Sequence, residues 1–365
     1  MIKLFKNFRR KLLAEGKTTN YLKYAIGEII LVVIGILIAL QLNTQKENRQ
    51  NAELGMKYLS EMKTEVQTDL FNIDARIRKL KENIKNHEAA LRTSNIDNLP
   101  LDSIVMIFTP ENLDFKISEL TFNKMKNLGV TALTDNKPLN SEISNYYNSK
   151  VVKLNLGLDY VFEDLKKYQD YFVYQQNKID FNFLYSLDFE FPSLYKQTKE
   201  ELRNETRINC IKFITSNEGR MIILGDLGNK RYSLGILEDF KSSTQHLLLA
   251  IYEELKANNS KIEPLLELPS DADFIAIVLD KETLNKYVGN YISESNIAVK
   301  VTTEGSKIYI EPTNGGNRSE LIPTREDRFY TKPSFAITQF NTEKGKVLSL
   351  TRMLAGAKKD YVKND

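Results

Sequence analysis

The stretch Ala25–Leu42 constrains this chain more than any other, because its eighteen residues carry one charge, Glu28, and one amide, Gln41. As a helix it spans about 27 Å, close to the hydrocarbon thickness of a bilayer. A soluble core helix would show a polar face, and residues 29–40 have none. A cleaved signal peptide fits poorly, because the run is too long for an h-region and no small-residue cleavage site follows it. We therefore predict one transmembrane helix over residues 24–43.

The segment before this run, residues 1–23, is short and basic. Its charges are Lys3, Lys6, Arg9, Arg10, Lys11, Lys17 and Lys23, against Glu15 alone. This excess predicts a cytoplasmic N-terminus, a single pass through a bacterial inner membrane, and a periplasmic location for the bulk of the chain. Apolar residues at helical spacing among the cations favour an amphipathic helix on the inner leaflet, with a solvated basic flank as the alternative.

The bulk composition excludes some classes of function. The net charge is +3, from 51 basic and 48 acidic residues, which does not indicate a nucleic-acid partner. Cys210 is the single cysteine, so no intramolecular disulfide can form, and one thiol does not identify the compartment. We interpret Cys210 as a buried structural thiol rather than a nucleophile.

Three residues of the span are candidates for an intramembrane contact: Glu28, Gly35 and Ala39. Gly35 and Ala39 form a small-x-x-x-small pair that lets two helices approach. An ionisable group within a span is expensive and usually paired, so Glu28 could meet a specific partner. It also lies about one turn from the cytoplasmic edge, where it could reach the interface or pair with Lys17 or Lys23. Both interpretations stay open.

Two long helices are predicted after the span. Residues 44–93 are strongly helix-forming, with apolar positions at steps of three and four that indicate a coiled-coil-like seam. A second helix, over residues 138–178, begins with a proline and has Asp135 or Asn136 as a cap. The simplest packing lays the two helices side by side and antiparallel, joined by residues 94–136.

Two further helices, over 205–226 and 230–257 around a Gly225–Gly228 break, would complete a bundle of about four helices. We predict a helical periplasmic domain over residues 44–258. The prolines and polar residues after it indicate a linker over residues 259–279.

The pattern then changes from helical to alternating, which predicts a small antiparallel β meander or barrel over residues 280–365. Strands are expected over residues 297–301, 308–310, 319–323, 328–332, 335–340 and 346–353. The predicted fold is therefore mainly α, with one N-terminal transmembrane helix, a long antiparallel helical bundle or coiled-coil ectodomain, and this β domain.

Two parts of the sequence resemble known families. YAIGEIILVVIGILIALQ, followed by LTFNKMKNLGVTALTDNKPLNSEISNYYN and IKFITSNEGRMIILGDLGNKRYSLGILEDF, resembles an uncharacterised family of bacterial single-span membrane proteins over residues 1–258. That likeness implies a helical periplasmic part and carries no activity. LNKYVGNY, VKVTTEGSKIYIEPTNG and ELIPTREDRFYTK resemble, over residues 281–362, the β domain appended to serine hydrolases related to penicillin-binding proteins. The chemistry of those proteins lies in a hydrolase domain that we do not find in this sequence.

No catalytic constellation emerges from the motifs. S-x-x-K occurs at Ser60–Lys63 and Ser193–Lys196, but no K-T-G follows either. The two histidines, His87 and His246, are far apart, which leaves a zinc site unsupported. His87 falls on the seam of the first long helix, where a buried polar residue is expected rather than a ligand.

Two other stretches have both a functional and a structural interpretation. Asp271 and Asp273 resemble the start of a calcium loop but lack its downstream spacing. The aromatic-rich stretch 179–203 is either a loop packed on the bundle or a binding patch. We predict no enzymatic activity, no cofactor and no metal site.

The leading hypothesis is a membrane-anchored periplasmic interaction protein, adapter or sensor-like, without catalytic activity of its own. Its expected partners are the lipid bilayer and either a second copy or another membrane protein. No nucleic acid is expected, and the sequence names no small-molecule ligand. The alternatives are a ligand-binding module of the cell envelope and an accessory subunit of a separate envelope hydrolase.

Overall fold

The computed structural model of the protein describes residues 18–92, 116–170, 199–259, 261–315, 317–332, 334–354 and 356–364, with residues 96, 104 and 107. The predicted basic segment lies outside the described residues as far as residue 17. The aromatic-rich stretch lies outside them as far as residue 198, which includes Ser193–Lys196. The predicted connection 94–136 is described continuously only from residue 116.

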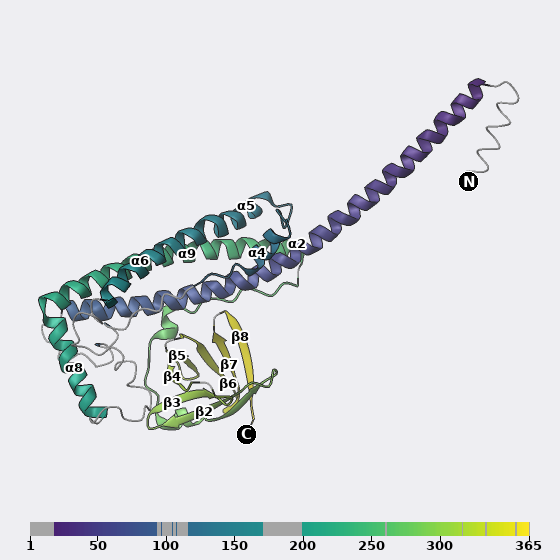
Figure 1. Cartoon of the computed structure of the whole chain (residues 1–365). Coiled ribbons are helices and arrows are strands. Elements are labelled where there is room, and N and C mark those ends of the chain that lie inside the picture. The colour runs from purple at the N-terminus through teal and green to yellow at the C-terminus, as the bar shows by residue number, and fades with distance from the viewer. Residues whose placement is uncertain are drawn as a thin grey trace.

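One helix, α2 (Thr18–Arg92), runs without a break for 75 residues from the apolar stretch into the body of the protein (Figure 1). At the standard rise it is about 110 Å long. Its character changes along its length: Ile26 and residues 29–42 are exposed, whereas from Tyr58 onward an apolar side chain is buried at about every third or fourth position. The span and the first long helix, which are predicted separately, form one continuous helix.

The antiparallel partner of α2 is α9 (Asn217–Asn258), the longest helix of the bundle after α2. Two ion pairs fix their relative direction, Lys81–Glu238 at 2.8 Å and Glu88–Arg231 at 2.6 Å. Apolar side chains of the two helices form the main core of the helical part, together with residues of the helix described next.

That helix consists of α5 (Lys137–Asn145), a π-helical turn η2 (Tyr146–Val151) and α6 (Val152–Asp170). Its start is as predicted, because the Asn136 side chain accepts a hydrogen bond from the backbone N–H of Leu139 at 3.2 Å.

The predicted antiparallel packing of this second helix on α2 is wrong. Its Tyr146 and Asp164 bond to Thr244 and Asn229, so it runs antiparallel to α9 and therefore in the same direction as α2. The physical reason is the connection after Arg92. Its continuously described part returns along α2, because Ser118 contacts Asp69, Thr121 contacts Glu65 and Leu133 lies against Gly55. Periodicity alone does not show this return.

The predicted helix break at Gly225–Gly228 is also wrong, because both glycines lie inside α9. The break falls between α8 (Lys199–Thr215) and α9, at Ser216. The Ser216 hydroxyl accepts a hydrogen bond from the backbone N–H of Gly219 at 3.0 Å, which caps α9. The glycines do not interrupt α9, because buried residues on both sides of them keep the helix packed. The cap at Ser216 instead marks where α9 begins.

The C-terminal part is a closed antiparallel barrel in which β1 also pairs with β8. Its strands are β1 (Gly289–Ser293), β2 (Ala298–Glu304), β3 (Lys307–Pro312), β4 (Ser319–Pro323), β5 (Arg328–Thr331), β6 (Ile337–Glu343), β7 (Lys346–Leu354) and β8 (Ala357–Lys363). A 3₁₀ turn, η4 (Asp271–Phe274), and a short helix, α10 (Lys281–Asn285), precede them.

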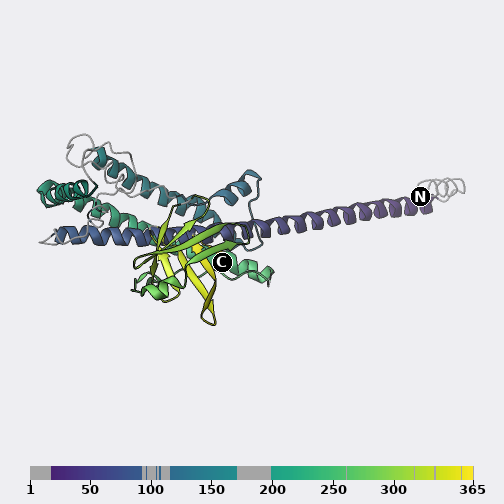
Figure 2. The same cartoon turned by 90° about the horizontal axis from the view of Figure 1, so that it is seen from below.

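The predicted fold class is confirmed, with a barrel rather than an open meander. The sequence pattern had not indicated β1 or β8, the two strands whose pairing closes it. Tyr291, Phe329 and Phe340 fill the barrel core with edge-to-face contacts. The barrel lies on the opposite side of α2 from α5 and α6 (Figures 1 and 2).

Candidate functional site

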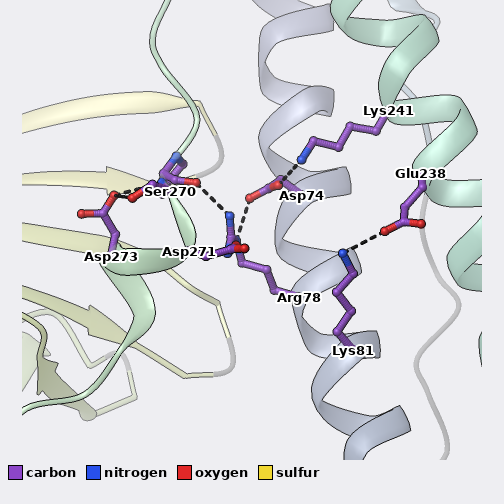
Figure 3. A network of polar contacts seen from close by, with 9 residues as sticks. Asp74, Arg78, Lys81, Glu238, Lys241, Ser270, Asp271 and Asp273 are labelled. Atoms are coloured by element: carbon purple, nitrogen blue, oxygen red, sulfur yellow. Dashed lines mark hydrogen bonds and ion pairs between the residues drawn. The ribbon is translucent and has the colours of Figure 1, made fainter.

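A polar junction joins the stem helix α2, the helix α9 and the segment that leads into the barrel. Its centre is Arg78, four residues after Asp74 on α2. The Arg78 Nε donates to Asp74 at 2.9 Å, one Nη donates to Asp271 of η4 at 2.6 Å, and the other donates to the backbone oxygen of Pro269 at 2.8 Å. Figure 3 shows Arg78 reaching from α2 to η4. One planar guanidinium therefore ties the stem to a segment about 190 residues away in sequence.

Asp74 connects the same arginine to α9. Only 4% of this residue is exposed, and its second carboxylate oxygen accepts a hydrogen bond from Lys241 of α9 at 2.5 Å. A buried carboxylate needs paired cations because burial removes its hydration. Asp74 satisfies that need with one cation from its own helix and one from α9, while the neighbouring pair Lys81–Glu238 repeats the link on the exposed side (Figure 3).

Aromatic contacts extend the junction to the barrel. The Arg78 guanidinium lies 4.2 Å from the ring centre of Phe274, which is within cation–π range. Phe274 in turn makes edge-to-face contacts with Tyr330 of β5 and with Phe335, at 5.4 and 5.5 Å between ring centres. The arginine is thus bonded to the linker and stacked on the ring that meets the barrel wall.

Close backbone contact fixes the barrel to α2 at a second point. Gly356, in the turn between β7 and β8, has a φ of +72°, and a Cβ there would lie 3.0 Å from the Cα of Thr68. Only glycine meets both conditions without strain. The backbone oxygen of Gly356 also accepts a hydrogen bond from the Gln67 side chain, and Lys332 pairs with Glu82.

The junction is suited to holding parts together rather than to acid–base chemistry. Hydrogen bonds from Arg78 keep the pKa of Asp271 below its usual range, so this carboxylate stays charged at neutral pH. Asp273 is likewise engaged, with Arg328 at 2.8 Å and with Ser270. Within the described ranges, no group of three or more His, Cys, Asp or Glu side chains could hold a metal ion.

A second polar cluster lies buried between α2 and α9, farther from the apolar stretch. One carboxylate oxygen of Asp226 is 2.7 Å from His87 Nε2 and 2.6 Å from Lys230 Nζ. The other imidazole nitrogen of His87 faces the backbone oxygen of Asn83 at 2.8 Å. Burial opposes ionisation of Asp226, but the hydrogen bonds and charges of His87 and Lys230 hold its pKa below the usual value. His87 is buried, as expected from its seam position.

A third cluster fixes the start of α4 (Leu120–Asn127) on the stem. Glu65 accepts hydrogen bonds from the hydroxyl of Thr121 at 2.6 Å and from its backbone N–H at 3.3 Å. Asp69, one turn farther along α2, accepts one from the backbone N–H of Ser118 at 3.1 Å. Burial raises the pKa of Asp69 to about 7, with Glu65 adding to the effect and Ser118 opposing it.

The three residues predicted for an intramembrane contact share one stripe of α2, because they are separated by seven and four residues. Gly35 and Ala39 are exposed, with no atom within 4 Å of a Cβ placed at Gly35. Glu28 is half-buried. The structure holds one chain, so an intermolecular role for Glu28, Gly35 and Ala39 stays a prediction.

The other residues singled out from the sequence occupy separate places. His246 is exposed on α9, 3.7 Å from Glu142, far along that helix from the His87 cluster. Cys210 of α8 is buried, and burial raises the pKa of its thiol to about 12. Ser60 is exposed on α2, and Lys63 donates to the backbone oxygen of Glu263.

Sequence reasoning missed Asp74, Arg78 and Lys241. A local signal existed for two of them, since Asp74 and Arg78 are four residues apart and adjoin the seam residues Ile73 and Ile77. No local signal pointed to Lys241, which lies 167 residues from its partner.

Comparison with known families found one match, to a family of unknown function (DUF6090), over residues 28–97. The match begins in the apolar stretch and covers the rest of α2, including Asp74 and Arg78. It fits the predicted likeness to an uncharacterised family in that region. Comparison with curated proteins found no match. The extension of the likeness to residues 1–258, and the resemblance of residues 281–362 to the hydrolase-appended domain, stay predictions.

One helix in the described part of the chain is long and apolar enough to cross a membrane, judged by length and composition. It is α2, and none of its most apolar window is buried inside the protein. A signal sequence near the N-terminus can meet the same criteria. Orientation and compartment therefore belong to the proposal that follows.

Proposed function

We propose that this protein is a membrane-anchored interaction protein, adapter or sensor-like, that holds a helical bundle and a barrel at a set distance from a bacterial inner membrane. The N-terminus lies in the cytoplasm and the bulk of the chain in the periplasm. The protein has no catalytic activity of its own and works by presenting surfaces to a second copy or to another membrane protein.

The observation that carries this proposal is the Arg78 junction on an unbroken helix. A helix that begins in an apolar stretch and continues into the bundle transmits position directly from the membrane to the outer parts. Arg78 and Asp74 then connect that helix to α9 and to the barrel-bearing segment. A hydrolytic site would need a nucleophile and a base with free lone pairs. Asp74, Arg78 and Asp271 of the junction are instead engaged with one another in ion pairs and hydrogen bonds.

The test is in-cell crosslinking of the full-length protein followed by mass spectrometry. The variant Arg78→Met removes the junction and keeps a long apolar side chain. The control Lys85→Met makes the same charge change at an exposed position of α2. We expect a specific membrane-protein partner whose yield falls in Arg78→Met and is unchanged in Lys85→Met. Recovery of self-crosslinks that neither substitution alters would contradict the adapter role.

Orientation has a separate test. Ser60 is exposed on α2 beyond the apolar stretch, and Cys210 is buried, so the variant Ser60→Cys offers one reactive thiol above a low background. A membrane-impermeant maleimide added to intact spheroplasts should label Ser60→Cys and not the parent protein. Labelling only after lysis would place this region in the cytoplasm and refute the proposed topology.

A further inference from the structure

An open groove of about 980 Å³ lies between α6 and α9. Among its lining residues are Lys150, Lys153, Tyr160, Tyr232, Gly235 and Ser242. It contains none of the junction residues and none of the buried clusters described above. The groove is therefore a surface without an assigned role.

A row of small residues on one face of α9 reaches the floor of the groove, where Gly235 and Ser242 line it. Gly228, Gly235 and Ser242 follow one another at intervals of seven residues, so they lie nearly in line along the helix. All three are exposed. The same interval reaches Met221 on one side and Leu249 on the other, with exposed fractions of 69% and 53%. The row therefore has small side chains at its middle positions and large apolar side chains at its two ends.

Internal packing does not account for the two glycines of this row. A Cβ at Gly228 or at Gly235 would have no atom within 4 Å. At Gly157 on α6, by contrast, a Cβ would lie 2.6 Å from Ile236, so that glycine serves the packing of α6 on α9. Glycine within a helix is less stable than alanine, and two glycines without an internal reason point to the approach of another backbone.

The walls of the groove favour an amphipathic helix as the occupant. Leu156 and Tyr160 are one turn apart on α6 and are each 66% exposed, and Tyr160 meets Tyr232 of α9 edge-on at 6.0 Å. A row with a seven-residue repeat matches the repeat of a helix packed along α9. Grooves with apolar positions at this spacing accept the apolar face of a partner helix.

Charge decides which helix fits. Lys150 of η2 and Lys153 of α6 are exposed and make no ion pair within the described residues, whereas Arg231 is already paired with Glu88. Asp239 is the one carboxylate among the lining residues. A second copy would present the same two unpaired lysines and be repelled. The complementary occupant is a helix that carries acidic residues beside its apolar face.

We propose that the groove between α6 and α9 binds an acidic amphipathic helix of another protein, seated on Gly235 and Ser242. This inference deepens the proposed function, on which it rests, by assigning the interaction to one surface. It sets the small residues as the contact for the partner backbone and the two lysines as the source of charge selectivity.

The experiment uses the full-length protein in lipid nanodiscs and two synthetic helical peptides as probes. Both peptides carry the same apolar residues at seven-residue spacing, flanked by glutamates in one and by lysines in the other. Fluorescence anisotropy should show saturable binding of the glutamate peptide at least about tenfold tighter than the lysine peptide. Equal binding of the two peptides, or no binding of either, would overturn the inference.

Two variants separate binding from folding. Gly235→Ala should raise the melting temperature, because nothing opposes the added methyl group, whereas Gly235→Leu should weaken the glutamate peptide at least about tenfold by filling the floor. Lys150→Glu with Lys153→Glu should abolish the preference for the glutamate peptide. Unchanged affinity in Gly235→Leu would refute the proposed seat.

The matched charge control is Lys300→Glu with Lys358→Glu, two exposed positions on the barrel, which should leave peptide binding intact. Self-association that depends on Gly235 would replace the proposed partner by a second copy. If the glutamate peptide fails to bind but an Arg78-dependent partner is still crosslinked in cells, the inference fails and the proposed function stands.

Discussion

Asp69 makes the stability of this protein depend on pH in a direction opposite to that of most carboxylates. Only 3% of Asp69 is exposed, and among the described groups its carboxylate accepts one hydrogen bond, from the backbone of Ser118. No cation is paired with it there, Glu65 lies nearby on α2, and the π-turn presents Tyr146 and Tyr147. Burial therefore favours the neutral acid and raises the pKa to about 7, from an ordinary value of 3.8.

The sign follows from which state holds the proton. Between about pH 4 and pH 7 the folded protein keeps a proton on Asp69 that the unfolded chain has lost, so stability falls as the pH rises through this window. A shift of about three units, at about 1.4 kcal/mol each, sets the whole effect at roughly 4 kcal/mol. Above pH 7 the full cost of a buried, unpaired carboxylate is present.

The variant Asp69→Asn keeps an oxygen for the N–H of Ser118 and removes the titration. We expect it to be more stable than the parent by as much as roughly 4 kcal/mol at pH 8, and within about 1 kcal/mol of it at pH 4. The assay is urea unfolding of the full-length protein in detergent, followed by circular dichroism at several pH values. The exposed Asp135→Asn is the control and should leave the profile unchanged. A parent profile parallel to that of Asp69→Asn, or a less stable variant at pH 8, would refute the reasoning.

Three further outcomes follow from buried or crowded positions. Asp226→Asn should lower the free energy of unfolding by about 3–5 kcal/mol in the same urea assay, because it leaves the buried Lys230 without its carboxylate. Gly55→Ala should lower the melting temperature, since its Cβ would lie 2.0 Å from the backbone oxygen of Leu133, and the overlap should cost about 1–3 kcal/mol. The Cys210 thiol should react with iodoacetamide, as read by mass spectrometry, only at the rate at which the bundle opens, since burial raises its pKa to about 12.

Features that depend on neighbouring residues were predictable from the sequence. The seam of α2 could be read from its spacing, and Pro138 narrowed the cap of the next helix to Asp135 or Asn136, of which Asn136 is the cap. Alternation placed Ile297, Val299, Val301, Ile308 and Ile310 on one face of the predicted strands. The last four are buried in the barrel, whereas Ile297, which precedes β2, is 38% exposed. Each of these signals acts within a turn of helix or along one strand.

Features that depend on distant residues were not predictable. Lys241 carries no local sign that it will meet Asp74, because that contact requires α9 to fold back along α2. The direction of α6 is set by a connection whose length permits either choice. β8 carries several charged residues and shows little alternation, so only its pairing with β1 reveals it as a strand. Gly228 suggested a helix break, yet its helix continues through it.

An unbroken α2 fixes orientation as well as distance. Its contacts with the barrel and with the segment that leads into it, at Gln67, Arg78 and Glu82, lie 25 to 40 residues after Leu42, which is about 38–60 Å along the helix axis. Each residue inserted between Leu42 and these contacts would move the barrel by about 1.5 Å along the helix axis and turn it by about 100° around that axis. An insertion of seven residues, close to two full turns, would nearly restore the rotation of the barrel about the axis while moving it about 10 Å along the axis. The length of this segment thus sets both the height of the barrel along the helix axis and its rotation about that axis, and an insertion that changes the height also changes the rotation.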